Sequence, residues 1–182
     1  MLGTSDRPDD IAFVRAKLKT AAKYELTTNL AAYATALIEM TGADGVSRLA
    51  EEYFVKSGRS NAELLEIVKA LSVQGTGGAV ELRPSIVDAY GRLLAVHPEL
   101  AGYVANDLFA WKVTRFVPRL REIFNAGVGL DEASHFAVAA YFQAPMKAGA
   151  SRVGSLGPMI SDEHFQGTIG LACTNRIIWR KQ

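Results

Sequence analysis

The sequence has a single cysteine, Cys173, among its 182 residues. One thiol cannot form an internal disulfide, and it also excludes Cys-x-x-Cys redox motifs and zinc sites with several thiolates. Charge of one sign is lacking too, because 20 basic residues face 19 acidic ones. This balance excludes the bulk positive charge that drives nucleic-acid binding. No run reaches the roughly 18 apolar residues that a membrane-spanning helix requires.

The first ten residues, MLGTSDRPDD, lack the basic segment and apolar core of a signal peptide. The length and the 49% content of hydrophobic residues are sufficient for one ordinary domain. We therefore expect a cytoplasmic globular protein with no membrane span and no nucleic-acid partner. No pattern in the sequence requires a cofactor.

Up to Pro145 the apolar residues recur with the period of a helix, and no strand-like alternation is found. Capping acids, a Ser60-to-Glu63 capping box, early prolines and terminal glycines separate the periodic segments. Residues 75–78, Gly-Thr-Gly-Gly, are predicted to be a flexible loop between helices. The fold class is therefore all-α, with about eight helices that begin near Asp6, Thr27, Asp44, Ser60, Pro84, Leu100, Thr114 and Asp131.

The sequence also contains an internal repeat. Residues 46–53 and 117–124 share the pattern Val-x-Arg-Leu-x-Glu-x-aromatic and lie 71 positions apart, which corresponds to two units of about 35 residues. Equivalent apolar positions recur at intervals of 34, 37 and 33 residues, namely Leu37, Leu71, Leu108 and Tyr141. One helix pair cannot cover its own apolar face, so such pairs stack into an α-solenoid. A helical bundle with loosely regular spacing is the alternative.

Residues 117–145 (VPRLREIF…DEASHFAVAAYFQAP) resemble a HEAT helix pair. More specifically, they are similar to uncharacterised bacterial HEAT-like proteins in which a Val-Pro-x-Leu helix precedes a helix that ends at proline. The likeness extends over roughly residues 10–145. It implies a stack of antiparallel helix pairs with a scaffold or interaction role, and it assigns no catalytic residue.

The regular helical pattern ends at Pro145, and beyond it glycines interrupt any long helix. We predict a helical-repeat domain over residues 1–145 and a less regular cap or arm over residues 146–182. Apolar residues such as Ile177, Ile178 and Trp179 indicate that the arm packs on the repeat or on a partner. A homodimer formed through this arm is one such arrangement.

Two groups of residues are candidates for a functional site. Arg48, Trp111, Arg115 and Arg119 are predicted to bind a protein or peptide partner, with an acidic peptide or a phosphate as the ligand of the basic cluster. The alternative for the arginines is ion pairing of Arg48 with Glu51 and of Arg119 with Glu122, since each pair has helical i, i+3 spacing.

Glu132 and His135 have the Glu-x-x-His spacing that places a carboxylate and an imidazole on one helix face. A di-metal carboxylate bundle needs two such motifs, and this sequence has one. The main hypothesis is a non-catalytic interaction module without a metal. The alternative is a small helical enzyme that binds a metal or ligand through Glu132 and His135.

Overall fold

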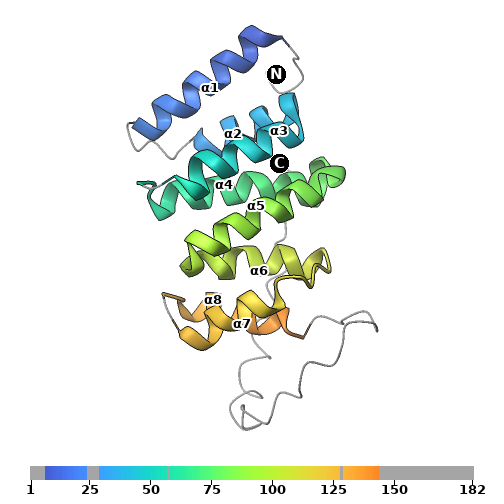
Figure 1. Cartoon of the computed structure of the whole chain (residues 1–182). Helices are drawn as coiled ribbons and strands as arrows, with labels where there is room; N and C mark the ends of the chain where they lie inside the picture. The colour runs from blue at the N-terminus through green and yellow to red at the C-terminus, as the bar shows by residue number, and fades with distance from the viewer. Residues whose placement is uncertain (1–6, 24–28, 57, 128, 144–182) are drawn as a thin grey trace, which may run out of the picture. The chain divides into compact units, whose positions relative to one another are not determined.

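The computed structural model describes residues 7–23, 29–56, 58–127 and 129–143. Every regular element in these ranges is helical, and eight α-helices are present among them (Figure 1). The all-α prediction is therefore confirmed. The predicted arm over residues 146–182, including Cys173, lies outside the described residues. None of the helices in the described ranges combines the length and the apolarity needed to cross a membrane.

The α-helices are interspersed with short π- and 3₁₀-helical segments, labelled η. In chain order the elements are α1 (Pro8–Lys23), α2 (Leu30–Thr41), α3 (Ala43–Leu49), η2 (Ala50–Val55), α4 (Asn61–Val73), η3 (Gln74–Gly78), η4 (Val80–Leu82), α5 (Arg83–Val96), η5 (Pro98–Leu100), α6 (Ala101–Ala110), α7 (Val117–Ala126) and α8 (Glu132–Tyr141).

Local capping chemistry explains where several helices begin. The Ser60 hydroxyl accepts a hydrogen bond from the Glu63 backbone N–H, and the Glu63 carboxylate accepts one from the Ser60 N–H at 2.9 Å. The predicted capping box is thus confirmed. Asp131 likewise accepts the Ser134 N–H at 2.7 Å at the start of α8. The corner between α2 and α3 is Gly42, whose φ of +59° is accessible to glycine at little cost.

The prediction of a flexible loop at residues 75–78 is wrong. The chain continues from α4 into the π-helical turn η3 instead. The Arg83 guanidinium donates a hydrogen bond to the Gly75 carbonyl at 2.6 Å, and the Gln74 amide donates one to Glu39 at 3.2 Å. These tertiary bonds hold a glycine-rich turn that local propensity disfavours.

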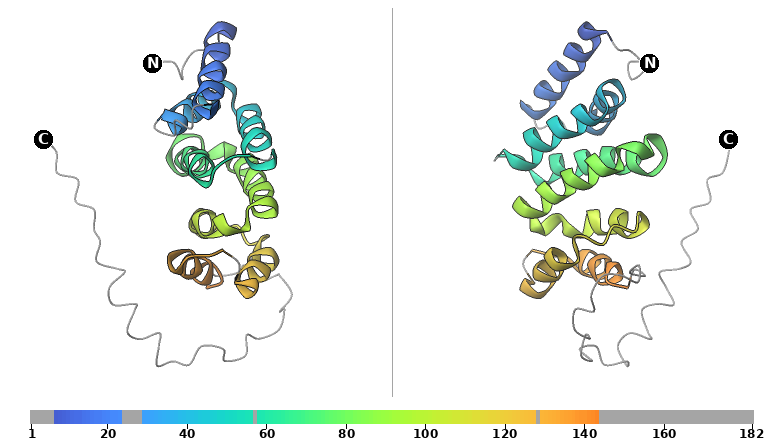
Figure 2. Two further views of the ribbon diagram at one scale, coloured as in Figure 1. Left: turned by 90° about the vertical axis from the view of Figure 1, so that its left-hand side faces the viewer. Right: turned by 45° about the vertical axis from the view of Figure 1, so that its right-hand side comes forward.

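Helices α2 to α8 form two rows, and α1 packs on α2. Helices α2, α4, α6 and α8 contact one another in that order. In the other row α3 and η2 pack on α5, and α7 is tied to α5 by a hydrogen bond between Arg119 and the Leu94 carbonyl. The left view of Figure 2 shows the rows beside each other. Contacts of α5 with α6 and of α7 with α8 connect them.

One hydrophobic core runs between the rows. Positions that recur about every 35 residues are all buried, one on each helix of the first row. The helical period of the sequence predicts a wider set of core positions, and all of these are buried: Leu37, Leu49, Leu71, Val87, Leu108, Leu120 and Val138.

Candidate functional site

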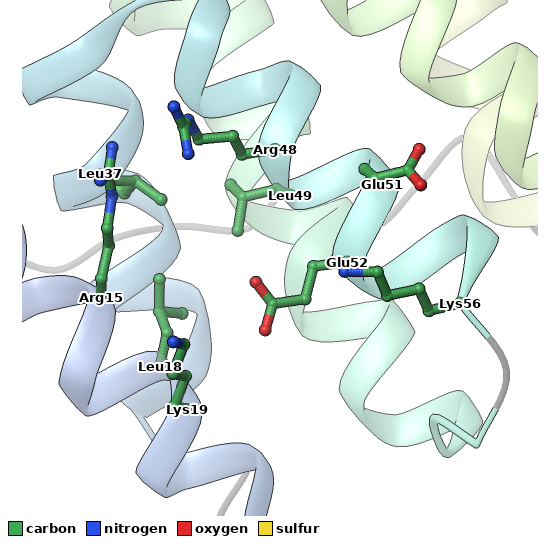
Figure 3. A pocket seen from close by; sticks show the side chains of 9 residues that line it. All are labelled: Arg15, Leu18, Lys19, Leu37, Arg48, Leu49, Glu51, Glu52 and Lys56. Atoms are coloured by element: carbon green, nitrogen blue, oxygen red, sulfur yellow. The ribbon is translucent and has the colours of Figure 1, made fainter.

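A cleft of about 450 Å³ opens between α1 and the segment formed by α3 and η2 (Figure 3). We call it the α1–α3 cleft. Arg15 and Lys19 rise from α1 on one side, and the side chains of α3 and η2 form the other. The residues that line it are Arg15, Leu18, Lys19, Leu37, Arg48, Leu49, Glu51, Glu52 and Lys56.

The two carboxylates of the α1–α3 cleft are bound by arginines that do not line it. Arg92 of α5 lies 3.7 Å from Glu51, whose side chain turns away from α1 (Figure 3). Arg59 lies 3.5 Å from Glu52. Neither carboxylate therefore neutralises the cations of the cleft by a direct ion pair. The predicted pairing of Arg48 with Glu51 is replaced by the pairing of Arg92 with Glu51.

The four cations of the cleft are Arg15, Lys19, Arg48 and Lys56. Within the described ranges none of them forms an ion pair. The Nε atom of Arg15 is also buried without a hydrogen-bond partner there. A buried N–H of a guanidinium without an acceptor is costly, which makes it an uncompensated positive group at this site.

Trp111 lies at a second, smaller hollow of about 330 Å³ that Arg83, Val87, Asp88 and Arg115 also line. Its indole stacks on Tyr90 with 5.9 Å between ring centroids and a 5° interplanar angle. It also packs directly against Gly75, so a Cβ at that position would overlap the ring. Much of the Trp111 side chain therefore serves packing, and part of it faces this hollow.

Arg115 and Arg119 both have partners within the protein. Arg115 forms an ion pair with Asp88 and stacks on the Phe116 ring, 4.8 Å from its centroid. Arg119 donates two hydrogen bonds to the Leu94 carbonyl at 3.0 and 3.2 Å. It also binds Glu122 at 3.2 Å, which confirms that predicted pair.

The predicted partner-binding residues thus fall into separate places. Trp111 and Arg115 share one hollow, Arg48 lines the α1–α3 cleft, and Arg119 reaches back to α5. Arg15, Lys19 and Lys56 were not among the predicted site residues. Their only sequence signal is the i, i+4 spacing of Arg15 and Lys19, which puts two cations on one face of a helix.

Glu132 and His135 lie in the first turns of α8. Glu132 is exposed, whereas His135 is half-buried with its ring edge-on to Phe124 at 5.3 Å between centroids. In the part of the chain that the structure describes, no three or more His, Cys, Asp or Glu side chains are grouped to hold a metal ion. The metal hypothesis rests on the sequence spacing alone.

Most of the shifted pKa values in the described residues belong to buried tyrosine hydroxyls. Burial raises the pKa of Tyr53 to about 12, and its hydroxyl has no hydrogen-bond partner within the described residues. Burial also raises the pKa of Tyr90 well above 10, helped by the Asp107 carboxylate that accepts its hydroxyl at 2.6 Å. The pKa of Tyr141 is raised to about 12 by burial, and its hydroxyl donates to the Val113 carbonyl. These are structural groups, each enclosed by helices.

Comparisons with protein-family models, with curated proteins and with solved structures give no match for this chain.

Proposed function

We propose that the chain is a non-catalytic protein-interaction or scaffold module built as a HEAT-like α-solenoid of antiparallel helix pairs. The observation that carries the proposal is the burial of Leu37, Leu71, Leu108 and Tyr141, each on the next helix of the row α2, α4, α6 and α8. A repeat of about 35 residues requires equivalent residues to occupy equivalent places in consecutive contacting helices.

Two hydrogen bonds between side chains support the same repeat length. Gln74 donates to Glu39, and Ser72 donates to Asp107, and in both pairs the residues are 35 positions apart. A contact between residues one unit apart is typical of neighbouring repeats that stack in register. A helical bundle without a repeat has no reason to favour this separation.

The partner surface follows the row of α3, α5 and α7, with Arg48 on α3, Arg119 on α7, and Trp111 and Arg115 in the connection between α6 and α7. In a solenoid the same row of helices provides a continuous surface for a protein or peptide. One hollow lies between α3 and α5, and another lies between α5 and the connection from α6 to α7 that contains Trp111 and Arg115. The bound partner is expected to be acidic.

Retention of proteins from the source cells by the immobilised chain tests the interaction role. The double variant Arg48→Glu and Arg115→Glu should lose proteins that the unmodified chain retains. The matched variant Lys69→Glu, on α4 of the other row, should retain them all. An identical set for all three proteins contradicts the proposed surface. Stoichiometric Fe, Mn or Zn that disappears in His135→Ala contradicts the non-catalytic proposal.

Hydrogen exchange tests the solenoid itself. In a stack of repeats each unit is stabilised by its neighbours only, so backbone protection should decline from α4 and α5 toward both ends. Protection of equal magnitude in all eight helices indicates a single cooperative bundle and contradicts the solenoid.

A further inference from the structure

We propose that the α1–α3 cleft binds an acidic segment of a partner protein, with the peptide carboxylates paired to Arg15, Lys19, Arg48 and Lys56. This inference rests on the proposed interaction function and assigns it a specific site and a ligand chemistry. It is carried by the charges of the cleft, by the guanidinium of Arg15, which lines the cleft without an ion pair in the described residues, and by the size of the hollow.

Both carboxylates that line the cleft are already paired with arginines. Glu51 and Glu52 have their ion pairs with Arg92 and Arg59 outside the cleft lining. The four cations of the cleft have no such pairs within the described residues. The lining has four cations and two carboxylates, of which Glu52 points toward α1 (Figure 3). The hollow therefore keeps a net positive charge, and an anionic ligand gains attraction without first breaking an ion pair of these cations.

Arg15 provides a second and independent argument. Its side chain is half-buried, and its Nε–H is enclosed without an acceptor in the described part of the chain. Desolvation of that N–H has already occurred in the free protein. Because Nε itself is enclosed, a carboxylate in the cleft reaches Arg15 through its terminal N–H groups, and charge-assisted hydrogen bonds of a guanidinium with a carboxylate are among the strongest in proteins.

The dimensions favour a peptide segment over a single small anion. The cleft has a volume of about 450 Å³, within the range of ligand-binding clefts. Its cations come from α1, from α3 and from Lys56, which follows η2, so one carboxylate cannot contact all four (Figure 3). A segment with several acidic residues can, and the leucines at the base, Leu18, Leu37 and Leu49, suit an aliphatic residue between them.

The surroundings of the cleft disfavour a nucleic-acid strand. The next hollow along the row, between α3 and α5, is lined by Asp44 and Asp88 as well as by Arg92. A phosphate backbone that continued from the cleft would meet these carboxylates. Proteins that bind nucleic acid track it with an extended positive surface, whereas here carboxylates line the hollow next to the cleft.

Fluorescence anisotropy with the full chain and a labelled synthetic peptide that repeats Glu-Glu-Leu tests the proposal. We expect saturable binding that weakens as salt is raised, and no binding of the matching Lys-Lys-Leu peptide. The double variant Arg15→Glu and Arg48→Glu should weaken binding by at least roughly tenfold. The control Lys17→Glu makes the same charge reversal on α1 at a residue that does not line the cleft. It should leave the affinity within about twofold of that of the unmodified protein.

Thermal melting monitored by circular dichroism verifies that both variants remain folded. If the double variant does not fold, the single variant Arg48→Glu replaces it, because Arg48 is exposed and its substitution disturbs the fold less. Equal weakening by Lys17→Glu overturns the site. Full displacement of the peptide by inorganic phosphate that binds through Arg48 overturns the peptide in favour of a small anion. Loss of binding in Arg115→Glu but not in the cleft variants overturns the cleft and leaves the proposed interaction function standing. If the chain binds no acidic peptide at all, the inference is overturned. The retention experiment described above then decides whether the chain has the proposed interaction role.

Discussion

Ser72 on α4 and Asp107 on α6 are joined by a hydrogen bond, in which the hydroxyl donates to the carboxylate at 2.8 Å. The other carboxylate oxygen of Asp107 accepts the Tyr90 hydroxyl at 2.6 Å. One aspartate therefore links three helices, α4, α5 and α6. Helix α5 belongs to one row, and α4 and α6 belong to the other. The two hydrogen bonds of Asp107 therefore connect the two rows near the middle of the described chain.

Removing the charge of Asp107 should weaken the fold. Asp107→Asn leaves the buried Tyr90 hydroxyl with a poorer acceptor, so the free energy of unfolding should fall by about 2–3 kcal/mol. Urea denaturation measures it. The control Asp88→Asn removes the exposed ion pair with Arg115 and should cost under about 1 kcal/mol. Equal losses in the two variants would show that the Asp107 network contributes nothing beyond an exposed pair.

Tyr53 differs from Tyr90 in its hydrogen bonding. The buried Tyr53 hydroxyl has no hydrogen-bond partner in the described residues, whereas the Tyr90 hydroxyl donates to Asp107. Tyr53→Phe removes that hydroxyl and should leave stability near neutral pH unchanged or raise it by about 1 kcal/mol or less. Tyr90→Phe should instead destabilise, because the Asp107 carboxylate loses its donor. Urea denaturation of both variants at the same pH compares them. Destabilisation by Tyr53→Phe as large as that by Tyr90→Phe contradicts the prediction.

The same tyrosine should contribute to alkaline unfolding. Below its unfolded pKa of 10 the hydroxyl of Tyr53 is neutral in both states, so its contribution to stability is complete. Between 10 and about 12 the unfolded chain loses the proton first, and stability falls as the pH rises. The slope is about 1.4 kcal/mol per pH unit for one such group. Urea denaturation at a series of pH values should show a shallower alkaline decline in Tyr53→Phe; an unchanged slope contradicts the assignment.

The periodicity of the sequence was sufficient to predict the helices and the core, because both depend on local spacing and on burial of one helix face. Leu37 and Leu108 were predicted to be buried for this reason, and they are. The capping box at Ser60 was equally local, since both of its partners lie within one turn.

Features that depend on distant partners could not be predicted. The π-helical turn at Gly75 is held by Arg83 and by the Trp111 ring, and neither contact is visible in a Gly-Thr-Gly-Gly sequence. The cleft is a similar case. The spacing of Arg15 and Lys19 places them on one face of α1, but their meeting with Arg48 depends on how α1 packs beside α3.

Arg119 should matter more than an exposed ion pair does. Its guanidinium binds the Leu94 carbonyl near the C-terminal end of α5, where carbonyls lack a partner within the helix. We expect Arg119→Ala to lower the free energy of unfolding by about 1–2 kcal/mol, whereas Glu122→Ala should cost under about 1 kcal/mol. Leu120→Ala, which empties a fully buried site in the same helix, should cost about 2–5 kcal/mol. Urea denaturation ranks the three, and an Arg119→Ala effect no larger than that of Glu122→Ala contradicts the role in joining α5 to α7.

The closest approach of α6 to α8 depends on a glycine. A Cβ at Gly102 would overlap both the backbone and the side chain of Ser134, so no rotamer change of Ser134 can accommodate it and the helices must move apart. Gly102→Ala should therefore destabilise by about 1–3 kcal/mol despite the better helix propensity of alanine. Gly77→Ala is the matched control, because nothing lies within 4 Å of a Cβ there, and its effect should stay within about 0.5 kcal/mol. Thermal and urea unfolding of both variants measure the difference. Because α6 and α8 are consecutive helices of one row, a stabilised Gly102→Ala variant would mean that the row is not packed as tightly as described.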